Sequence, residues 1–452
     1  MPNSRNKNVI IIVIDTLRKD YASMLEHVLE KEGFVSYENV IAPSSWTIPS
    51  HASIFTGLYP LIHGAHETLH VKLPNIKLRR GRSLLLPTIL SKYGFNTYLL
   101  TANPLIHPAY GFLGFRYRYE PKYLSFAFHG LLTAKERLLL SGILMKYAPK
   151  NKFETIEKLV RRRAYKLLMK LAIETFMNKL YLNFIKKWSR EKGAKDILNK
   201  LKNLNFSSKK ANFIFINLME VHGPHPIRGR VTTLDALKGE VDMRVIASWR
   251  YYYRRQVDYI TRIILKFIDV FNEKNLLDNS LIIVTSDHGE LLGEDGRIGH
   301  GTFLYDELLR VPLLIKYPPH VSIKEASDTY EYKYVSLTKI RSLVLKFVRD
   351  RLYSDEFLYS DTVFAESFGI PNPIPYCSES DKSLLNSLEK YRLAIYYNGF
   401  KGLFNVSESK FEELKNYNNE EAPKDIIEVM RTKVIRYLDR ATKFIKFSEL
   451  LK

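Results

Sequence analysis

The sequence predicts an α/β fold with a mainly parallel central sheet, because buried strands alternate with helical patterns along the chain. Three apolar runs, at residues 8–15, 212–219 and 280–287, are rich in Ile, Val and Phe and lack the alternation typical of half-exposed strands. Helical patterns lie between them, at residues 89–95 and 258–271 among others. Such alternation favours layers of helices packed on a parallel sheet.

The first of these runs also bears on targeting. It resembles the apolar part of a signal peptide, but residues 9–14 are only six positions, end on Asp15 and lack a small-residue cleavage site. No stretch approaches the roughly 20 apolar residues of a membrane span. We therefore expect a cytoplasmic protein without signal peptide or transmembrane segment, with peripheral contact at the inner membrane face as an open alternative.

The composition of the chain limits the kinds of partner that we expect. The 452 residues are enough for one large or two medium domains, and the net charge of +21 predicts an anionic partner. We do not expect nucleic acid, because no binding module accompanies the charge. The single cysteine, Cys377, excludes an intrachain disulfide framework and a cysteine-based metal site.

A basic helical insertion is predicted at about residues 120–205. Helical periodicity is strong over residues 153–188, and residues 146–202 hold 17 Lys and Arg against 5 Asp and Glu, with apolar and aromatic residues between them. One interpretation is a helical insertion packed on the core with a solvated basic face. The other is a surface that contacts an anionic membrane or polymer.

The pattern changes after Pro318, which predicts a smaller C-terminal subdomain. Residues 371–376 form a predicted loop, residues 391–406 a hairpin that turns at Asn398-Gly399, and residues 423–449 a final helix. We divide the chain into a catalytic domain and a C-terminal α+β subdomain, over residues 1–320 and 321–452.

Candidate metal ligands follow two of the apolar runs. Asp15 ends the first run, and Asp287 and His288 end the third. In open α/β sheets, ligands bind at the carboxyl ends of strands. Adjacent side chains reach one ion only where a strand turns, which Gly289 permits. Carboxylate and imidazole together suit Mn²⁺, Zn²⁺ or Fe²⁺ better than Ca²⁺. For Asp15 alone, capping of a loop is the simpler interpretation.

A second candidate is the stretch TIPSH, Thr47 to His51. Pro49 fixes the local backbone, and we expect a helix to begin at Pro49 or Ser50, whose free N–H groups attract an anion. A threonine hydroxyl is a poor nucleophile unless a metal or base activates it. Considered alone, the stretch is explained as well by helix capping.

Three further histidines, His222, His225 and His300, lie beyond the second and third runs. Singly, each fits a core or surface position as well as a ligand or proton donor. Together with the strand-end carboxylates and the TIPSH loop, they are expected to meet at one edge of the sheet.

These motifs resemble the sulfatase family of the alkaline phosphatase superfamily. That family's nucleophile motif is Cys or Ser, any residue, Pro-Ser-Arg, four residues and Thr-Gly, and its spacing is kept from Thr47 to Gly57. VIDTLRKDY, LMEVHGPH, SDHGELLGEDGRIGHG, VPLLIKYP and KGLFNVSESKFEELKN resemble other family segments. The resemblance spans nearly the whole chain except residues 120–205. It implies a three-layer sandwich like that of alkaline phosphatases and sulfatases.

Four departures from the family pattern stand out. Thr47 cannot give the formylglycine aldehyde of authentic sulfatases, His51 replaces an Arg, Thr16 a second Asp, and His288 an Asn. These changes resemble the branch with a threonine nucleophile, which includes lipoteichoic acid synthase, phosphoethanolamine transferases and related phosphodiesterases. The resemblance implies one divalent ion, Mn²⁺ or Zn²⁺ before Ca²⁺, held by Asp15, Thr47, Asp287 and His288.

The resemblance implies a metal-dependent hydrolase or transferase acting on phosphate esters, with Thr47 as nucleophile and His222 or His300 protonating the leaving oxygen. Ser50, His51 and His225 would bind the substrate. Alternatives are a sulfate-ester hydrolase without formylglycine and a catalytically silent binding protein. A second metal, held by Glu220, His222 and His300, is also open. The expected partner is an anionic phosphate or sulfate ester of a lipid or glycan, with membrane contact through residues 146–202.

Overall fold

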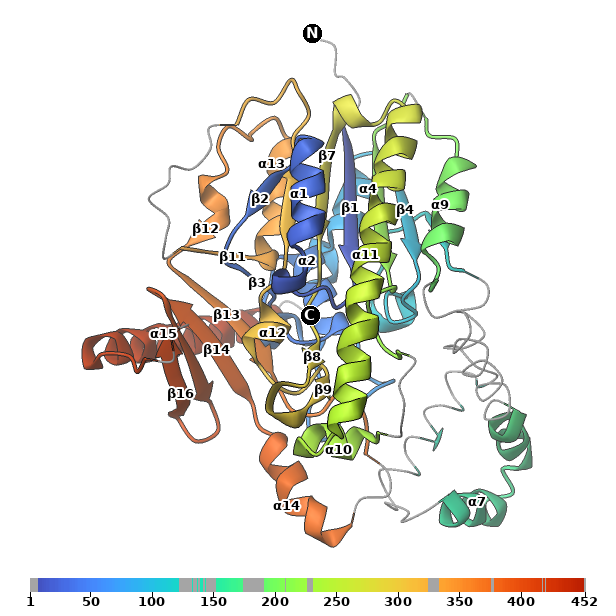
Figure 1. Cartoon of the computed structure of the whole chain (residues 1–452), viewed down its shortest axis with the longest axis vertical. Helices are drawn as coiled ribbons and strands as arrows, with labels where there is room; N and C mark the ends of the chain where they lie inside the picture. Colours follow the sequence, from blue (N-terminus) through green and yellow to red (C-terminus); the bar gives the residue numbers. More distant parts are fainter. Residues whose placement is uncertain are drawn as a thin grey trace.

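The computed structural model confirms the α/β fold and the mainly parallel sheet (Figure 1). It describes residues 7–121, 152–173, 191–207, 209–225, 231–323, 333–374, 378–416 and 420–450, with a few single residues at 132–143 and 418. The seven-stranded central sheet has the order β2-β10-β7-β1-β6-β4-β5, and only β10 runs antiparallel to its neighbours. Its strands are β1 (Asn8–Ile14), β2 (Val35–Tyr37), β4 (Asn96–Thr101), β5 (Tyr117–Tyr119), β6 (Asn212–Leu218), β7 (Ser280–Thr285) and β10 (Leu313–Lys316).

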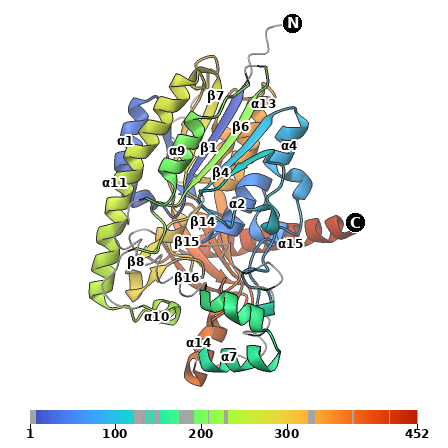
Figure 2. The same cartoon turned by 90° about the vertical axis from the view of Figure 1, so that its right-hand side faces the viewer.

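Helices cover both faces of this sheet, which makes three layers (Figure 2). Every residue of β1 is buried because its side chains alternate between two cores: Ile10, Ile12 and Ile14 join one cluster, and Val9 and Ile11 the other. One layer contains α1 (Ser23–Lys31), α9 (Ala194–Lys202) and α11 (Met243–Glu273); the other contains α2 (Thr47–Thr56), α4 (Leu86–Lys92) and α13 (Ile340–Val348).

The C-terminal part forms a four-stranded antiparallel sheet, as the sequence indicated. Its order is β13-β14-β15-β16, and the predicted hairpin turns at Asn398-Gly399, where both residues have positive φ. The final helix packs on this sheet through Met430 and Val434. The elements are β13 (Thr362–Ser367), β14 (Arg392–Tyr397), β15 (Phe400–Asn405), β16 (Lys410–Asn416), α14 (Glu379–Leu388) and α15 (Lys424–Leu450).

Smaller elements connect these two parts. A three-stranded sheet joins β3 (Val40–Ile41), which comes early in the chain, to β11 (Tyr334–Ser336) and β12 (Tyr359–Ser360). Strand β11 therefore contacts segments on both sides of residue 320, and the predicted domain boundary there stays a prediction. The remaining elements are α3 (Pro60–His63), α10 (Thr233–Lys238), α12 (Asp306–Leu309), β8 (Leu291–Leu292) and β9 (Ile298–Gly299).

The basic insertion is helical where the structure describes it. Helix α7 spans Lys152–Arg161, a further helical stretch covers residues 165–173, and Leu159 and Leu167 pack together in a small core of their own. Residues 174–190, which complete the predicted periodic segment, lie outside the described residues. Among the helices that the structure describes, none has the length and apolar character that crossing a membrane requires.

Candidate active site

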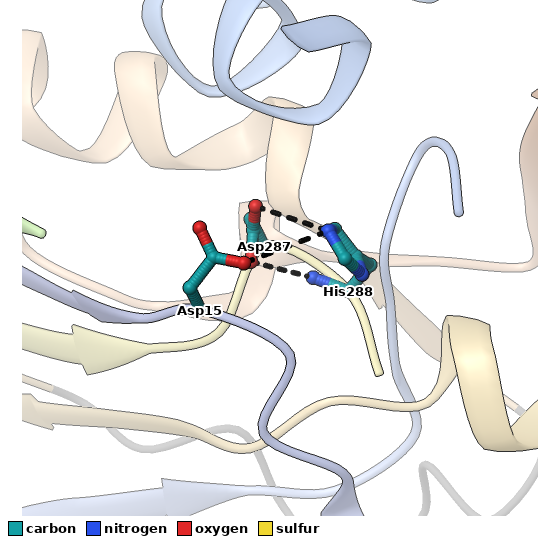
Figure 3. A group of neighbouring side chains, drawn as sticks. All are labelled: Asp15, Asp287 and His288. Carbon is teal, nitrogen blue, oxygen red and sulfur yellow. Dashed lines mark hydrogen bonds and ion pairs between the residues drawn. The ribbon is translucent and has the colours of Figure 1, made fainter. Parts of the chain in front are cut away.

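Polar side chains from four neighbouring strands meet at the carboxyl edge of the central sheet. Asp15 follows β1, and Asp287 and His288 follow β7, so their side chains converge as Figure 3 shows. Asn217 lies near the end of β6, and Asn103 comes two residues after β4. All five side chains are buried. Parallel strands bring these residues together because their carboxyl ends share one edge.

Each of the two aspartates has one oxygen engaged and one free. Asp15 Oδ2 accepts hydrogen bonds from Asn103 Nδ2 at 2.7 Å and Asn217 Nδ2 at 3.5 Å. Asp287 Oδ1 accepts from the backbone N–H groups of Thr16, at 3.3 Å, and His288, at 3.1 Å. The other oxygens, Asp15 Oδ1 and Asp287 Oδ2, are buried without a hydrogen bond in the described part of the chain. Burying free carboxylate oxygens is costly unless a cation pairs them.

The ring of His288 completes this group. Its Nδ1 donates to the carbonyl of Gly289 at 2.8 Å, which leaves Nε2 with a free lone pair. Nε2 lies 3.4 Å from Asp287 Oδ2 and 3.8 Å from Asp15 Oδ1. Burial and the neighbouring His300 lower the pKa of His288 to about 3, so the imidazole is neutral, as a metal ligand requires.

These donors fit a divalent cation. One ligand atom each of Asp15, Asp287 and His288 lies within 4.8 Å of the others. Two carboxylate oxygens and a neutral imidazole suit Mn²⁺, Zn²⁺ or Fe²⁺, and the two free carboxylate oxygens are the buried charges such an ion would pair. The Thr47 hydroxyl lies 3.5 Å from His288 Nε2, and its role as a fourth ligand stays a prediction.

Thr47 is the first residue of helix α2, which begins two or three residues before the predicted start at Pro49 or Ser50. Trp46 is the last residue in extended conformation, so the helix already includes Thr47 and Ile48 before it reaches Pro49. Asn103 Nδ2 lies 3.5 Å from the Thr47 hydroxyl. The first turn of a helix carries free N–H groups and a positive dipole, which favour negative charge on this hydroxyl.

Ser50 and His51, which follow Pro49, are held by hydrogen bonds to nearby backbone carbonyls. Ser50 donates its hydroxyl to the carbonyl of Ser44 at 2.9 Å, which ties the loop to the helix. His51 Nδ1 donates to the Thr47 carbonyl at 3.0 Å and lies 3.3 Å from Asp287 Oδ2. Burial opposes a charge on His51, but the carboxylates of Asp287 and Asp15 outweigh it and raise its pKa. Roles for Ser50 and His51 in substrate binding stay predictions.

A row of histidines extends from the aspartates toward solvent. The ring of His300 lies 4.5 Å from that of His288 and 4.9 Å from that of His222, centre to centre. His300 Nδ1 donates to Glu290 Oε2 at 3.1 Å, so its Nε2 is available, and its side chain is 20% exposed. Burial disfavours the imidazolium, but Glu290 outweighs it and raises the pKa of His300. A partly exposed imidazole with a raised pKa has the properties of a proton donor, and the predicted role of His300 in catalysis stays a prediction.

His222 and His225 differ in their surroundings. His222 Nδ1 donates to the carbonyl of Gly223, and burial lowers its pKa. His225 is buried with its ring 4.8 Å from that of Trp249, and neither ring nitrogen has a hydrogen-bond partner among the described residues. Burial lowers its pKa well below the ordinary value. His225 thus lies in an apolar setting, and its predicted contact with substrate stays a prediction.

Glu220, expected at a second metal site, contacts the start of α9. Its Oε1 accepts from the backbone N–H groups of Lys192 at 3.0 Å and Ala194 at 2.8 Å, while its Oε2 has no hydrogen bond among the described residues. Burial raises its pKa to about 7. Within the described residues, only Asp15, Asp287 and His288 form a cluster of carboxylate and histidine donors close enough for one ion, and the second metal stays a prediction.

The backbone around these residues is unusual at two positions. Thr16 has a φ of +63°, in the region that non-glycine residues avoid, while its N–H donates to Asp287. Gly289 is needed for a different reason than its predicted turn. A Cβ there would lie 1.9 Å from the carbonyl oxygen of Glu307, so the close approach of two backbones excludes any side chain.

Four residues of the site were missed in the sequence: Asn103, Asn217, Glu290 and Lys192. Asn217 carried a signal, because it is a polar residue inside an apolar run and buried polar groups need partners. Glu290 belongs to the SDHGE stretch that drew attention to Asp287. Asn103 and Lys192 follow no pattern in the sequence, and only the fold brings them to this edge.

This fold and this set of side chains define a class of metal-dependent ester-cleaving enzymes. The Sulfatase family pattern matches residues 7–338, so the chain belongs to the Sulfatase family. Family membership and hydrolases with the same fold support an ester hydrolase. The metal group at Asp15, Asp287 and His288 agrees with the divalent ion that such enzymes typically bind.

Similar proteins include enzymes that act on sulfur and phosphorus esters. The chain is 32% identical over 98 residues to an N-acetylglucosamine-6-O-sulfatase of Bacteroides thetaiotaomicron. It is 40% identical over 65 residues to the low-salt glycan biosynthesis sulfotransferase Agl7 of Haloferax volcanii. These segments span 20% and 14% of this chain, and only 17% and 16% of those relatives.

Solved structures share the fold over almost the full chain. The phosphonate monoester hydrolase SpPMH of Silicibacter pomeroyi aligns with a TM-score of 0.56 and 15% identity, covering 97% of this chain and 95% of its own. The 2-O GAG sulfatase BT1596 aligns with a TM-score of 0.61 and 12% identity, covering 97% and 93%. Such low identities establish the fold and leave the substrate open.

Proposed function

We propose that the chain is a metal-dependent hydrolase or transferase that acts on phosphate esters through Thr47. The observation that carries this proposal is the position of the Thr47 hydroxyl. Thr47 begins a buried helix, and its hydroxyl lies 3.5 Å from both His288 Nε2 and Asn103 Nδ2. Two carboxylate oxygens at the same sheet edge, Asp15 Oδ1 and Asp287 Oδ2, have no hydrogen bond among the described residues. Threonine cannot be converted to the aldehyde that sulfatases use, so the hydroxyl itself is the available nucleophile.

Asp15, Asp287, His288 and Thr47 would hold the metal ion. Such an ion supplies Lewis-acid activation of a bound hydroxyl and of ester oxygens. The chain's own groups orient the reaction. Asn103 Nδ2 lies next to the Thr47 oxygen and fixes its direction, and the start of α2 favours the ionised hydroxyl. The Thr47 hydroxyl gives up its proton to water, its oxygen forms a bond to phosphorus, and the bond from phosphorus to the leaving oxygen breaks.

The leaving oxygen needs a proton, which His300 is placed to donate. Its Nδ1 is held by Glu290, which supports the imidazolium and leaves Nε2 directed away from that bond. His222, whose ring lies beside that of His300, is the alternative donor, but burial lowers its pKa and so disfavours its charged form. Water or an acceptor alcohol then releases the group from Thr47, which gives hydrolysis or transfer.

A panel of nitrophenyl esters tests this proposal. Phosphodiester, phosphomonoester and sulfate substrates would each be assayed metal-free and with Mn²⁺, Zn²⁺ or Ca²⁺. We expect phosphoester turnover with Mn²⁺ or Zn²⁺ that Thr47→Ala reduces by about 10³-fold or more. Thr47→Ser, which keeps a hydroxyl, is the matched control. Full turnover in metal-loaded Thr47→Ala would exclude Thr47 as the nucleophile.

A sulfate-ester hydrolase without formylglycine is the second candidate. Family membership and the sulfatases with the same fold support it. Turnover of the sulfate ester alone in the same panel would favour this candidate over the first. A sulfated sugar would then be the natural class to assay, because similar proteins include an N-acetylglucosamine-6-O-sulfatase and a protein solved with its substrate D-glucosamine-2-N,6-O-disulfate.

The substrate is proposed to be an anionic ester of a lipid or glycan. The net charge of +21 and the basic insertion support an anionic substrate or surface. The described part of the insertion also exposes large apolar side chains. Phe153 is 82% exposed, and Tyr165 and Met169 are each 59% exposed, close in sequence to Arg161, Arg162 and Arg163. Basic and apolar residues on one exposed segment suit the surface of an anionic membrane.

Vesicle binding tests this contact. We expect the protein to bind vesicles containing phosphatidylglycerol and not vesicles of phosphatidylcholine alone. Replacing Phe153, Tyr165 and Met169 by Ser should weaken binding to the anionic vesicles. Tyr353→Ser, at a position 73% exposed on another part of the chain, is the control. Equally weak binding of the unaltered protein to both kinds of vesicle would remove the membrane contact.

A further inference from the structure

Lys192 is a buried lysine that the catalytic proposal does not use. It is 7% exposed, and its Nζ donates to the carbonyl of His222. No carboxylate of the described residues lies within ion-pair distance of Nζ, although the charges of Glu220, Glu290 and Asp15 act on it. Burying an ammonium group without a paired anion costs several kcal/mol, roughly, and such groups are usually paired.

The position of Lys192 is firmly held. Its backbone N–H and that of Ala194 both donate to Glu220 Oε1, directly after β6. The same oxygen thus attaches the returning end of the basic insertion to the carboxyl edge of the central sheet. Gln256 Nε2 in turn donates to the carbonyl of Glu220 at 2.8 Å and fixes that residue against α11.

The neighbours of Lys192 connect it to the proposed reaction centre. His222, which accepts from Nζ through its carbonyl, has its ring next to that of His300, and His300 lies next to His288. A side-chain ammonium has three N–H donors, and only one has an acceptor among the described residues. Two donors of the ammonium group therefore have no acceptor among the described residues and are available to a ligand.

We propose that Lys192 binds the anionic oxygens of the ester group that the site transfers. This inference rests on the proposed function and adds Lys192 as the positively charged side chain that binds the anionic substrate. The ammonium would pair the negative charge of the bound phosphate or sulfate, and the ligand would supply the direct anionic contact that no described carboxylate makes with it. The residue comes from the insertion, outside the motifs that identify the site.

Anion binding without turnover tests this assignment. In a Thr47→Ala background with Mn²⁺ present, inorganic phosphate and inorganic sulfate would be titrated by calorimetry. Adding Lys192→Met should weaken binding of either anion by about 10- to 100-fold, the range of a charge-assisted hydrogen bond. Lys202→Met removes an exposed lysine at the end of α9, the helix that follows Lys192, and should change the affinity by less than about twofold.

Two outcomes would overturn the assignment: equal anion affinity with and without Lys192→Met, or no anion binding in the Thr47→Ala background. Lys192→Arg keeps the charge and should retain most of the affinity, and a loss as large as that of Lys192→Met would also contradict the role. In the enzyme that keeps Thr47, Lys192→Met should raise KM by a larger factor than it lowers kcat. The ester panel tests the nucleophile separately, so either proposal can fail alone.

Discussion

Two kinds of buried acid occur in this molecule, and they differ in how their oxygens are satisfied. Asp15 and Asp287, at the sheet edge, each have one oxygen without a hydrogen bond among the described residues. Glu366, on β13, has both oxygens engaged: Oε1 accepts from the hydroxyls of Tyr391 at 2.6 Å and Tyr437 at 2.7 Å, and Oε2 from the N–H of Leu61 at 2.6 Å.

Glu67 follows the second pattern. Its Oε2 accepts from Trp46 Nε1 and its Oε1 from the N–H of Phe368, both at 2.9 Å. Glu67 and Glu366 thus join α2 and α3 to the C-terminal sheet, and the fold itself supplies their partners. Asp15 Oδ1 and Asp287 Oδ2 instead have no hydrogen bond among the described residues, and histidine rings lie near them, with His51 Nδ1 at 3.3 Å from Asp287 Oδ2. Burial alone does not identify a functional acid, whereas buried oxygens without a hydrogen bond that cluster with an imidazole point to a cation site.

The largest effect is expected at Asp287. Asp287→Asn removes a negative ligand, and turnover should fall by about 10³-fold or more, together with binding of Mn²⁺ or Zn²⁺. The metal-free protein should keep or gain thermal stability, because fewer negative charges remain buried together. Calorimetric metal titration and thermal unfolding would measure both effects. A folded variant with full metal affinity would contradict the distinction between the two kinds of acid.

A smaller loss is expected at His300. His300→Gln keeps a polar group but cannot donate a proton, and kcat should fall by about 10²- to 10⁴-fold. A nitrophenyl leaving group needs less protonation than an alkyl one, so the loss should be smaller for the nitrophenyl ester. Comparing both substrates checks this assignment. A loss of equal size for the two would indicate that His300 acts in another way than as the acid.

Glu366 should affect stability and not chemistry. Glu366→Ala leaves two tyrosine hydroxyls and one backbone N–H buried without an acceptor, which costs about 1–3 kcal/mol for each group that water does not reach. We expect the free energy of unfolding to fall by about 2–5 kcal/mol in denaturant titration. Turnover per folded molecule should stay within about threefold of the unaltered protein. Loss of turnover in the folded variant would contradict a purely structural role for Glu366.

The free energy of unfolding is also expected to depend on pH. Burial raises the pKa of both Glu67 and Glu366 to about 7, above the ordinary glutamate value of 4.5. Between these values the folded chain binds more protons than the unfolded chain. Each group therefore stabilises the fold fully below about pH 4.5, and this contribution is lost as the pH rises toward 7.

Each group should contribute a slope of up to about 1.4 kcal/mol per pH unit within that window. Unfolding titrations between pH 4.5 and 7 would measure it. Glu366→Gln should remove the part of the pH slope that Glu366 contributes and leave the part that Glu67 contributes. A variant with an unchanged slope would mean that Glu366 is already ionised in the folded protein.

Much of the site was predictable because its residues occupy strand ends. Asp15 and Asp287 follow apolar runs whose burial the sequence shows, and parallel strands have to end at one edge. The start of α2 was predicted two or three residues late, because Pro49 marks the first turn but does not define where it begins. Glu366 and Glu67 were not anticipated, since nothing near them in sequence indicates that both would be buried.

The sequence by itself determined the layered α/β fold, the buried strands and the C-terminal hairpin, and it singled out Asp15, Asp287 and His288, which the structure brings together. Local patterns suffice for these features, because periodicity and turn residues act over a few positions. Only the tertiary structure decided which oxygens stay free and that Lys192 returns to the site. Both depend on contacts between distant segments, such as Glu220 with Lys192 and Asp15 with Asn103, and no local pattern encodes such contacts.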